Sequence, residues 1–311
     1  MTTTIRHHIA RYLEINRSLG YRFEQHEELL RRFARFAEAR NETHVRSETA
    51  LEWASASGTA SSSTYQVAKL RVLHDFAVWL HAEDDRHEIP PRDALGPLNR
   101  QRPQPHLMSV ADIGKLLTAA WSMGPPGTIA PLTWHYLFGL IAATGLRTGE
   151  ALALTLDDIT PDGLVIREAK FGKTRLVALH PTSLDALNVY LEARLEETTR
   201  DRHVFVIATG RTPSLDHVNR VFPTLAERAG LRSPGAARRP TARSLRHSFA
   251  VRSLEELAPG TKPDRHMLAL ATYLGHVDVT SSYWYLEATP VLLRGIAEAA
   301  EHAHATGASH D

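Results

Sequence analysis

The chain has 311 residues, a length that suits two ordinary domains, and its 43% hydrophobic and 23% charged residues are typical of a folded globular protein. It contains no cysteine, which excludes disulfides, thiolate metal sites and cysteine nucleophiles. The formal net charge is only +1, so any affinity for nucleic acid must come from the distribution of charge. No apolar run approaches the ~20 residues that span a bilayer, and Met1 to Ala10 lack the apolar core of a signal peptide. We therefore expect a cytoplasmic protein with no membrane partner.

Residues 1–83 are predicted to form a module of four short helices. Apolar residues recur at helical spacing in four stretches, 5–20, 29–36, 47–53 and 64–81. The second stretch carries Arg31, Arg32 and Arg35 among its apolar residues. The module should therefore present a basic helical face.

Residues 84–106 differ from what precedes them. Helix-breaking prolines recur in this stretch, at Pro90, Pro91, Pro97, Pro103 and Pro105, and arginines add positive charge, at Arg92, Arg100 and Arg102. This composition predicts an interdomain linker. The alternative is a structured surface loop.

Residues 107–302 are predicted to form a second, mostly helical domain with one β-hairpin. The hairpin comprises short β-type runs at 164–167 and 174–179 around the turn 170–173. Helices are expected at about 181–197, 215–229, 244–257, 263–274 and 290–302. Residues 303–311 are expected to be a flexible tail. The predicted fold class is mainly α, with a small hairpin in the second domain.

Four local patterns in this domain could carry chemistry. In the first, Arg147 follows the helix-ending Gly145, and Glu150 three residues later could hold its guanidinium in one orientation. In the second, Lys170 and Lys173 lie on the hairpin turn, where a flexible ammonium could protonate a leaving alkoxide. Each also has a plain structural explanation, as a helix-start ion pair and as solvated turn residues.

The third pattern is a basic helix. Arg243 and Arg246 share a helix face, and two guanidiniums side by side repel each other unless an anion lies between them. Arg238 and Arg239, just upstream, extend the positive patch. The alternative explanation is an exposed basic helix with no ligand.

In the fourth pattern, Gly275 ends a helix, His276 follows it, and Tyr285 lies nine residues after His276. Tyrosines in a helix are more often packing residues than nucleophiles. The order of the four patterns is more specific than any one of them. A TGLRxxE turn, a hairpin lysine, an LRH helix, an LGH turn and a tyrosine in this order resemble the tyrosine recombinase, or phage integrase, family over roughly residues 107–300.

That resemblance implies a role for each matching residue. Arg147 and Arg246 would clamp the scissile DNA phosphate, Lys170 would protonate the leaving 5′-hydroxyl, and Tyr285 would be the nucleophile. His276 matches the second histidine of the family, and Glu150 and His247 would support the site. The phosphotyrosine would conserve the energy of the DNA bond, so the resemblance implies neither a metal nor another cofactor.

One position departs from the family pattern. The family usually has histidine, sometimes lysine, three residues before the second arginine, where this chain has Arg243. A guanidinium can stabilise phosphate charge but is a poor proton carrier. A proton that must move in the reaction would then pass through His276 or, if its side chain rotates in, His247.

The resemblance also implies partners. We expect double-stranded DNA, bound in part by Arg31, Arg32, Arg35, Arg100, Arg102, Arg238 and Arg239, and a homotetrameric synapse at the nucleoid, in which residues 290–302 dock on a neighbouring subunit. Other recombinases could act beside it. The favoured function is site-specific recombination or integration for a mobile element. The alternatives are a catalytically weakened partner that binds recombination sites, a type IB topoisomerase, and a helical DNA-binding regulator without a covalent step.

Overall fold

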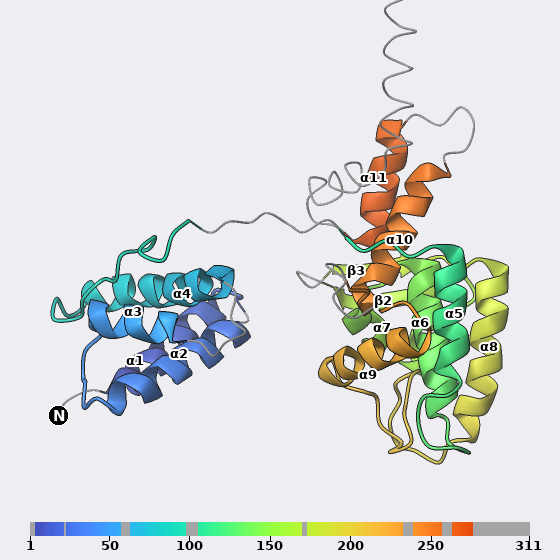
Figure 1. The fold of residues 1–311 in the computed structure, drawn as a ribbon, viewed down its shortest axis with the longest axis horizontal. Helices are drawn as coiled ribbons and strands as arrows, with labels where there is room; N and C mark the ends of the chain where they lie inside the picture. Colours follow the sequence, from blue (N-terminus) through green and yellow to red (C-terminus); the bar gives the residue numbers. More distant parts are fainter. Residues whose placement is uncertain are drawn as a thin grey trace, which may run out of the picture. The chain divides into compact units, whose positions relative to one another are not determined.

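The computed structural model describes residues 4–21, 23–56, 63–97, 105–169, 173–232, 239–256 and 263–275. They fold into two compact units that divide between Pro103 and Gln104 (Figure 1). Both units are mainly helical, and the second also holds a small antiparallel sheet. The predicted fold class is confirmed.

The first unit is built from four helices in its described part. They are α1 (Ile5–Ser18), α2 (Glu24–Glu38), α3 (Ser47–Ser55) and α4 (Ser63–His81). Each helix buries its apolar stripe in one shared core. Aromatic rings meet there edge to face, with ring centroids 5.2 Å apart for Tyr12 and Phe76 and 5.5 Å apart for Phe33 and Trp53.

A buried lysine holds the end of α3. The Nζ of Lys69 donates hydrogen bonds to the carbonyl oxygens of Trp53, at 2.6 Å, and Ala54, at 3.3 Å, and lies 4.3 Å from the centre of the Trp53 ring. The ammonium thus satisfies carbonyls that the helix leaves unpaired and lies over an aromatic face. Burial lowers the pKa of Lys69. The role of this lysine is structural.

The stretch 84–97, where the linker was expected to begin, is bonded to the first unit. The backbone N–H of Val45 donates to Nδ1 of the buried His87 at 3.1 Å. The carboxylate of Glu88 accepts a hydrogen bond from the backbone of Ser47 at 2.8 Å and pairs with Arg46 at 2.9 Å. These contacts hold the start of the stretch against the first unit. Residues 98–104 lie outside the described part.

The second unit contains the remaining elements. They are α5 (Val110–Ala120), α6 (Ala130–Thr144), α7 (Thr148–Ala153), η1 (Leu156–Asp158), β1 (Ile159–Thr160), β2 (Gly163–Ala169), β3 (Lys173–Val177), α8 (Pro181–Glu196), α9 (Leu215–Arg228), α10 (Ala242–Glu255) and α11 (Pro263–Leu274). The predicted hairpin corresponds to β2 and β3. The short strand β1 was not predicted. It pairs antiparallel with β2 through Ile159 opposite Leu164, and two residues are too few to show the alternation of a strand.

Helix α6 is the centre of the second unit. It packs against α5, α8 and α10 (Figure 1), and its residues Leu137, Phe138 and Ile141 are fully buried. The helix ends at Gly145, whose φ of +64° lies in the left-handed region that glycine adopts without strain. A smaller apolar cluster joins α10 to α11. Through α10, the position of α11 is therefore tied to the main core.

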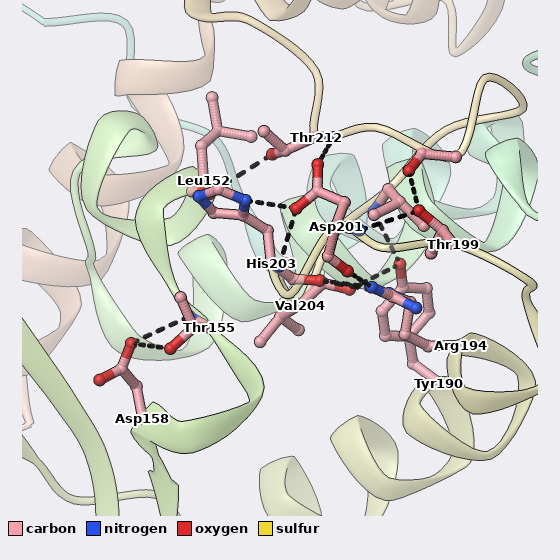
Figure 2. Close-up of polar contacts among 12 residues, drawn as sticks. Leu152, Thr155, Asp158, Tyr190, Arg194, Thr199, Asp201, His203, Val204 and Thr212 are labelled. Carbon is pink, nitrogen blue, oxygen red and sulfur yellow. Dashed lines mark hydrogen bonds and ion pairs between the residues drawn. The ribbon is translucent and has the colours of Figure 1, made fainter.

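A polar network fixes the loop between α8 and α9 (Figure 2). The carboxylate of Asp201 accepts hydrogen bonds from the backbone of His203 at 2.9 Å and of Thr212 at 2.8 Å, and it pairs with the His203 ring at 2.5 Å. Arg194, buried on α8, donates to the carbonyl oxygens of Asp201 and His203. Burial by itself would raise the pKa of Asp201, but these hydrogen bonds lower it to about 2. The ionised carboxylate therefore stabilises the loop.

Replacing this carboxylate should destabilise the second unit in a pH-dependent way. Asp201→Asn is expected to lower the free energy of unfolding at pH 7 by about 2 kcal/mol, since a shift from 3.8 to about 2 corresponds to that order of energy. A carboxylate whose pKa is lowered by folding contributes above its unfolded pKa. The difference between wild type and variant should therefore be complete above about pH 4 and shrink as the pH falls toward 2. Urea unfolding across this range measures it, with the exposed Asp162→Asn as the control. A difference that did not change with pH would contradict the assignment.

Candidate active site

Three arginines distant in sequence meet at the C-terminal end of α11. The carbonyl oxygens of Tyr273, Leu274 and Gly275 are consecutive in the chain, and each accepts from a different guanidinium. Arg175 donates to Tyr273 at 3.0 Å, Arg246 to Leu274 at 2.9 Å and Arg147 to Gly275 at 3.0 Å. The last carbonyls of a helix lack intrahelical partners and carry partial negative charge, so they attract cations. The helix end thus gathers three positive side chains.

Glu150 lies among these arginines and holds two of them. Its carboxylate accepts from Arg147 at 2.6 Å and from both terminal nitrogens of Arg175, at 3.1 and 2.8 Å. It also accepts from the backbone N–H of Arg147 at 3.0 Å, which caps the start of α7. Burial alone would raise the pKa of Glu150, but the Arg175 and Arg147 contacts lower it to about 2. One ionised carboxylate against three guanidiniums leaves the cluster with excess positive charge, which suits an anion.

Arg246 is held by a second turn as well. Its guanidinium donates to the carbonyl oxygen of Gly145 at 2.6 Å, and the residue is only 5% exposed. The backbone at Gly145 comes so close to α10 and α11 that a Cβ there would lie 2.4 Å from Phe249 and 2.9 Å from Leu274. The glycine before Arg147 therefore lets α6, α10 and α11 converge on one point.

The predicted catalytic and supporting residues fall into three groups. Arg147, Glu150 and Arg246 come together as described above. Arg243 is exposed in the first turn of α10, and His247, in the next turn, is half-buried. Lys170, His276 and Tyr285 lie outside the described residues. The predictions for these three stay predictions. Gly275, the last described residue, directly precedes His276 in the sequence.

Sequence reasoning did not single out Arg175. It lies on β3 in the same KxxKxR stretch that drew attention to Lys170. One signal was available. Arg175 pairs across the hairpin with Ile166, which is buried, so a charged side chain lies on the buried side of the hairpin. Only the tertiary structure shows that Glu150 and Tyr273 lie within its reach.

The predicted DNA-binding arginines have different surroundings. Arg31 and Arg32 of α2 pair with Glu27 at 2.5 Å and Glu28 at 3.8 Å, one helical turn before them. Arg35 and Arg239 are exposed. Arg100, Arg102 and Arg238 lie outside the described residues.

One group of side chains in the first unit has the composition of a metal site. His44, Asp84 and His87 approach one another although the sequence separates them. Asp84 already binds Arg86 with both carboxylate oxygens, at 2.9 and 2.6 Å. Nδ1 of His87 accepts from the backbone of Val45, so the proton of its neutral ring sits on Nε2 and blocks that nitrogen as a ligand. The contacts fit a hydrogen-bonded histidine cluster better than a metal centre.

Comparison with known proteins identifies the family. Residues 110–290 match the model of the phage integrase family. The chain is 35% identical over 301 residues to a putative integrase/recombinase, y4rB, of Sinorhizobium fredii, which covers 94% of this chain and 95% of the relative. It is 30% identical over 235 residues to the tyrosine recombinase XerD of Rhizobium meliloti, covering 73% of this chain and 71% of the relative.

The chain is a tyrosine recombinase of the phage integrase family. Members of this family are enzymes that cleave and rejoin DNA through a covalent bond to a tyrosine. The family predicted from the order of the four sequence patterns is thereby confirmed. No helix in the described part of this recombinase is both long and apolar enough to cross a membrane.

Solved structures show the same fold at low sequence identity. The XerH site-specific recombinase bound to palindromic difH substrate matches with a TM-score of 0.64 at 19% identity, over 89% of this chain and 79% of that one. The Tn1549 transposon integrase in complex with transposon right end DNA matches with a TM-score of 0.65 at 16% identity, over 91% of this chain and 94% of that one. The mainly helical fold with a small sheet is therefore that of the recombinases.

Glu150 can be tested through DNA cleavage. Glu150→Gln removes the charge between Arg147 and Arg175 and turns an amide N–H₂ toward a guanidinium. Cleavage of a nicked DNA carrying the recombination site should slow by about 10²-fold, because a small misplacement of a positioned group costs that much. The exposed Glu192→Gln on α8 is the matched control. Single-turnover rates measure the effect, and a Glu150→Gln rate equal to that of the control would show that Glu150 does not orient Arg147.

Proposed function

We propose that this tyrosine recombinase is a site-specific recombinase or integrase of a mobile genetic element, with Tyr285 as its nucleophile. The observation that carries the proposal is the meeting of Arg147 and Arg246 at the last carbonyls of α11. These two arginines come from separate motifs, and the chain continues from that helix end into His276 and, nine residues later, Tyr285. A phosphate bound between the two guanidiniums would thus lie near the segment that carries the nucleophile.

The mechanism follows from the chemistry of these groups. The phenolic oxygen of Tyr285 attacks the scissile phosphorus, and the bond from phosphorus to the 5′-oxygen breaks, which leaves a 3′-phosphotyrosine. Lys170 gives its proton to the departing 5′-oxygen. Arg147, Arg246 and Arg243 neutralise the charge that builds on the other phosphate oxygens, a contribution that is usually the largest in such reactions. Rejoining reverses these steps, so the cycle needs no external energy source.

Arg243 changes how protons can move. The guanidinium stays ionised at any working pH, so it can hold the phosphate without exchanging protons. His276 is then the group that accepts the phenolic proton of Tyr285. Arg243 could also lower the rate of DNA cleavage, and the enzyme would then act beside a more active recombinase. That weakened, site-binding role is the second candidate function, and Arg243 is the residue that favours it.

The role in a mobile element and the partners rest on the relatives. The similar S. fredii protein is described as a putative integrase/recombinase, and one structural neighbour is a transposon integrase. Another neighbour is a lambda integrase tetramer bound to a Holliday junction. By analogy, this recombinase acts on double-stranded sites at the nucleoid as a tetramer, with residues 290–302 docked on a neighbouring subunit. The relatives y4rB and XerD are named as recombinases, which favours the recombinase function over the type IB alternative.

Tyr285 is tested by the loss of one hydroxyl. Tyr285→Phe should abolish the covalent protein–DNA adduct on a nicked site and leave DNA affinity unchanged, since only the attacking oxygen is removed. Denaturing gels detect the adduct, and a mobility shift measures the affinity. Tyr283→Phe is the matched control, because Tyr283 lies two residues away. An adduct that survived Tyr285→Phe and vanished in Tyr283→Phe would assign the nucleophile to Tyr283.

A substitution series tests Arg243. Arg243→Ala should slow cleavage by about 10²-fold or more, as the loss of a preorganised transition-state donor does elsewhere. Arg243→Lys should keep part of the rate because it retains the charge but not the planar fork. Arg243→His tests the weakened-partner alternative: a strong rise in cleavage would support it. An Arg243→Ala enzyme with the wild-type rate would remove the residue from the site.

A further inference from the structure

Arg175 on β3 links three segments that the proposed mechanism needs. Its terminal nitrogens donate to Glu150 at 3.1 and 2.8 Å, and its Nε donates to the carbonyl oxygen of Tyr273 at 3.0 Å. Glu150 in turn holds Arg147 at the start of α7, and Tyr273 lies in the last turn of α11. One side chain therefore joins the hairpin strand, the α7 start and the α11 end.

Arg175 is poorly placed to bind DNA itself. Each of its three guanidinium nitrogens already donates to the protein. Gly275 closes over it, because a Cβ at that glycine would lie 2.8 Å from one terminal nitrogen and 2.9 Å from the guanidinium carbon. Gly275 has a φ of +67°, where glycine is unstrained. Any effect of Arg175 on catalysis must therefore pass through the groups that it holds.

The same hairpin offers a contrast. Arg167 on β2 is also a paired arginine, bonded to Asp158 at 2.5 Å, but its side chain is 63% exposed and its partner lies in η1. Arg167 thus connects the hairpin only to the neighbouring segment. Arg175 connects it across about 100 residues of sequence to α11, a separation of the kind that only tertiary contacts create.

We propose that Arg175 is a positioning residue: it seats the β2–β3 hairpin against the end of α11 and, through Glu150, aims the Arg147 guanidinium. The proposal rests on the proposed function for the roles of Arg147 and of the hairpin lysine. The same Arg175 guanidinium makes both contacts, so docking of the hairpin against α11 also orients Arg147. A hairpin displaced from α11 would take Arg175 with it and leave Glu150 free to draw Arg147 out of line.

The test compares Arg175→Ala and Arg175→Lys with Arg167→Ala in the full-length protein. The first readout is the single-turnover rate of adduct formation at saturating nicked DNA. Arg175→Ala should be about 10²-fold slower, the cost expected when a positioned group is misaligned. DNA affinity should stay within about threefold of wild type, since Arg175 does not touch the DNA. Arg175→Lys should recover part of the rate, because an ammonium can still reach one Glu150 oxygen, and Arg167→Ala should cleave at the wild-type rate.

A double substitution tests the route through Glu150. If Arg175 acts on Arg147 through this carboxylate, Arg175→Ala in a Glu150→Gln background should slow cleavage much less than it does alone. Full multiplication of the two effects would overturn that route. A defect seen only as weaker DNA binding, with the rate at saturation unchanged, would overturn the positioning role.

A readout that does not depend on activity separates this inference from the proposed function. Amide hydrogen exchange at residues 272–275 should speed up by about tenfold or more in Arg175→Ala and stay unchanged in Arg167→Ala, because a charged hydrogen bond to the helix end is lost. Unchanged amide exchange in Arg175→Ala would contradict this inference even if the wild type cleaves DNA. Faster exchange in Arg175→Ala, together with a wild type that forms no adduct through Tyr285, would instead support the positioning role of Arg175 and refute the proposed function.

Discussion

The carbonyl oxygens at the end of α11 are the constraint on which the site depends. Three guanidiniums packed side by side would normally repel one another, and a buried cation without a partner is costly. Here each guanidinium has a backbone acceptor in the last turn of one helix. The helix end therefore does two things at once: it satisfies its own unpaired carbonyls, and it fixes the distances among the arginines. The proposed phosphate site is a consequence of how this helix ends.

Glu150 sets how many of those charges stay available. It is 9% exposed and stays ionised well below neutral pH, because two arginines surround it. It engages Arg175 with two hydrogen bonds and Arg147 with one side-chain bond. The Arg175 side chain is only 14% exposed, whereas the Arg147 side chain is 34% exposed. This one carboxylate thus binds a mostly buried arginine and a more exposed one.

Sequence patterns predicted the parts of the site that are local. The helix ending at Gly145, the pair Arg147 and Glu150, and the hairpin all follow from spacing over a few residues. Arg175 could not be found that way, because its partner Tyr273 is distant in the chain and a backbone carbonyl leaves no mark in the sequence. The same holds for residues 84–97, because the contacts of His87 and Glu88 with the start of α3 join segments 42 and 41 residues apart in the chain. The proline content of a segment indicates that it is not helical, but it does not indicate which part of the protein the segment contacts.

The two arginines proposed to clamp the phosphate differ in burial, and this suggests a division of labour. Arg246 is fixed by the carbonyls of Gly145 and Leu274, which belong to two different turns, so it can move only if α6 or α11 moves. Arg147 donates hydrogen bonds to Glu150 and to the carbonyl oxygen of Gly275, and both of these residues also lie against Arg175. A rigidly held guanidinium can define the position of the phosphate. The position of a guanidinium held through Glu150 and Arg175 depends on whether the β2–β3 hairpin is docked against α11. In the proposed clamp, one arginine is thus held by two backbone carbonyls, and the other shares Glu150 with Arg175 and so depends on the contact between β3 and α11.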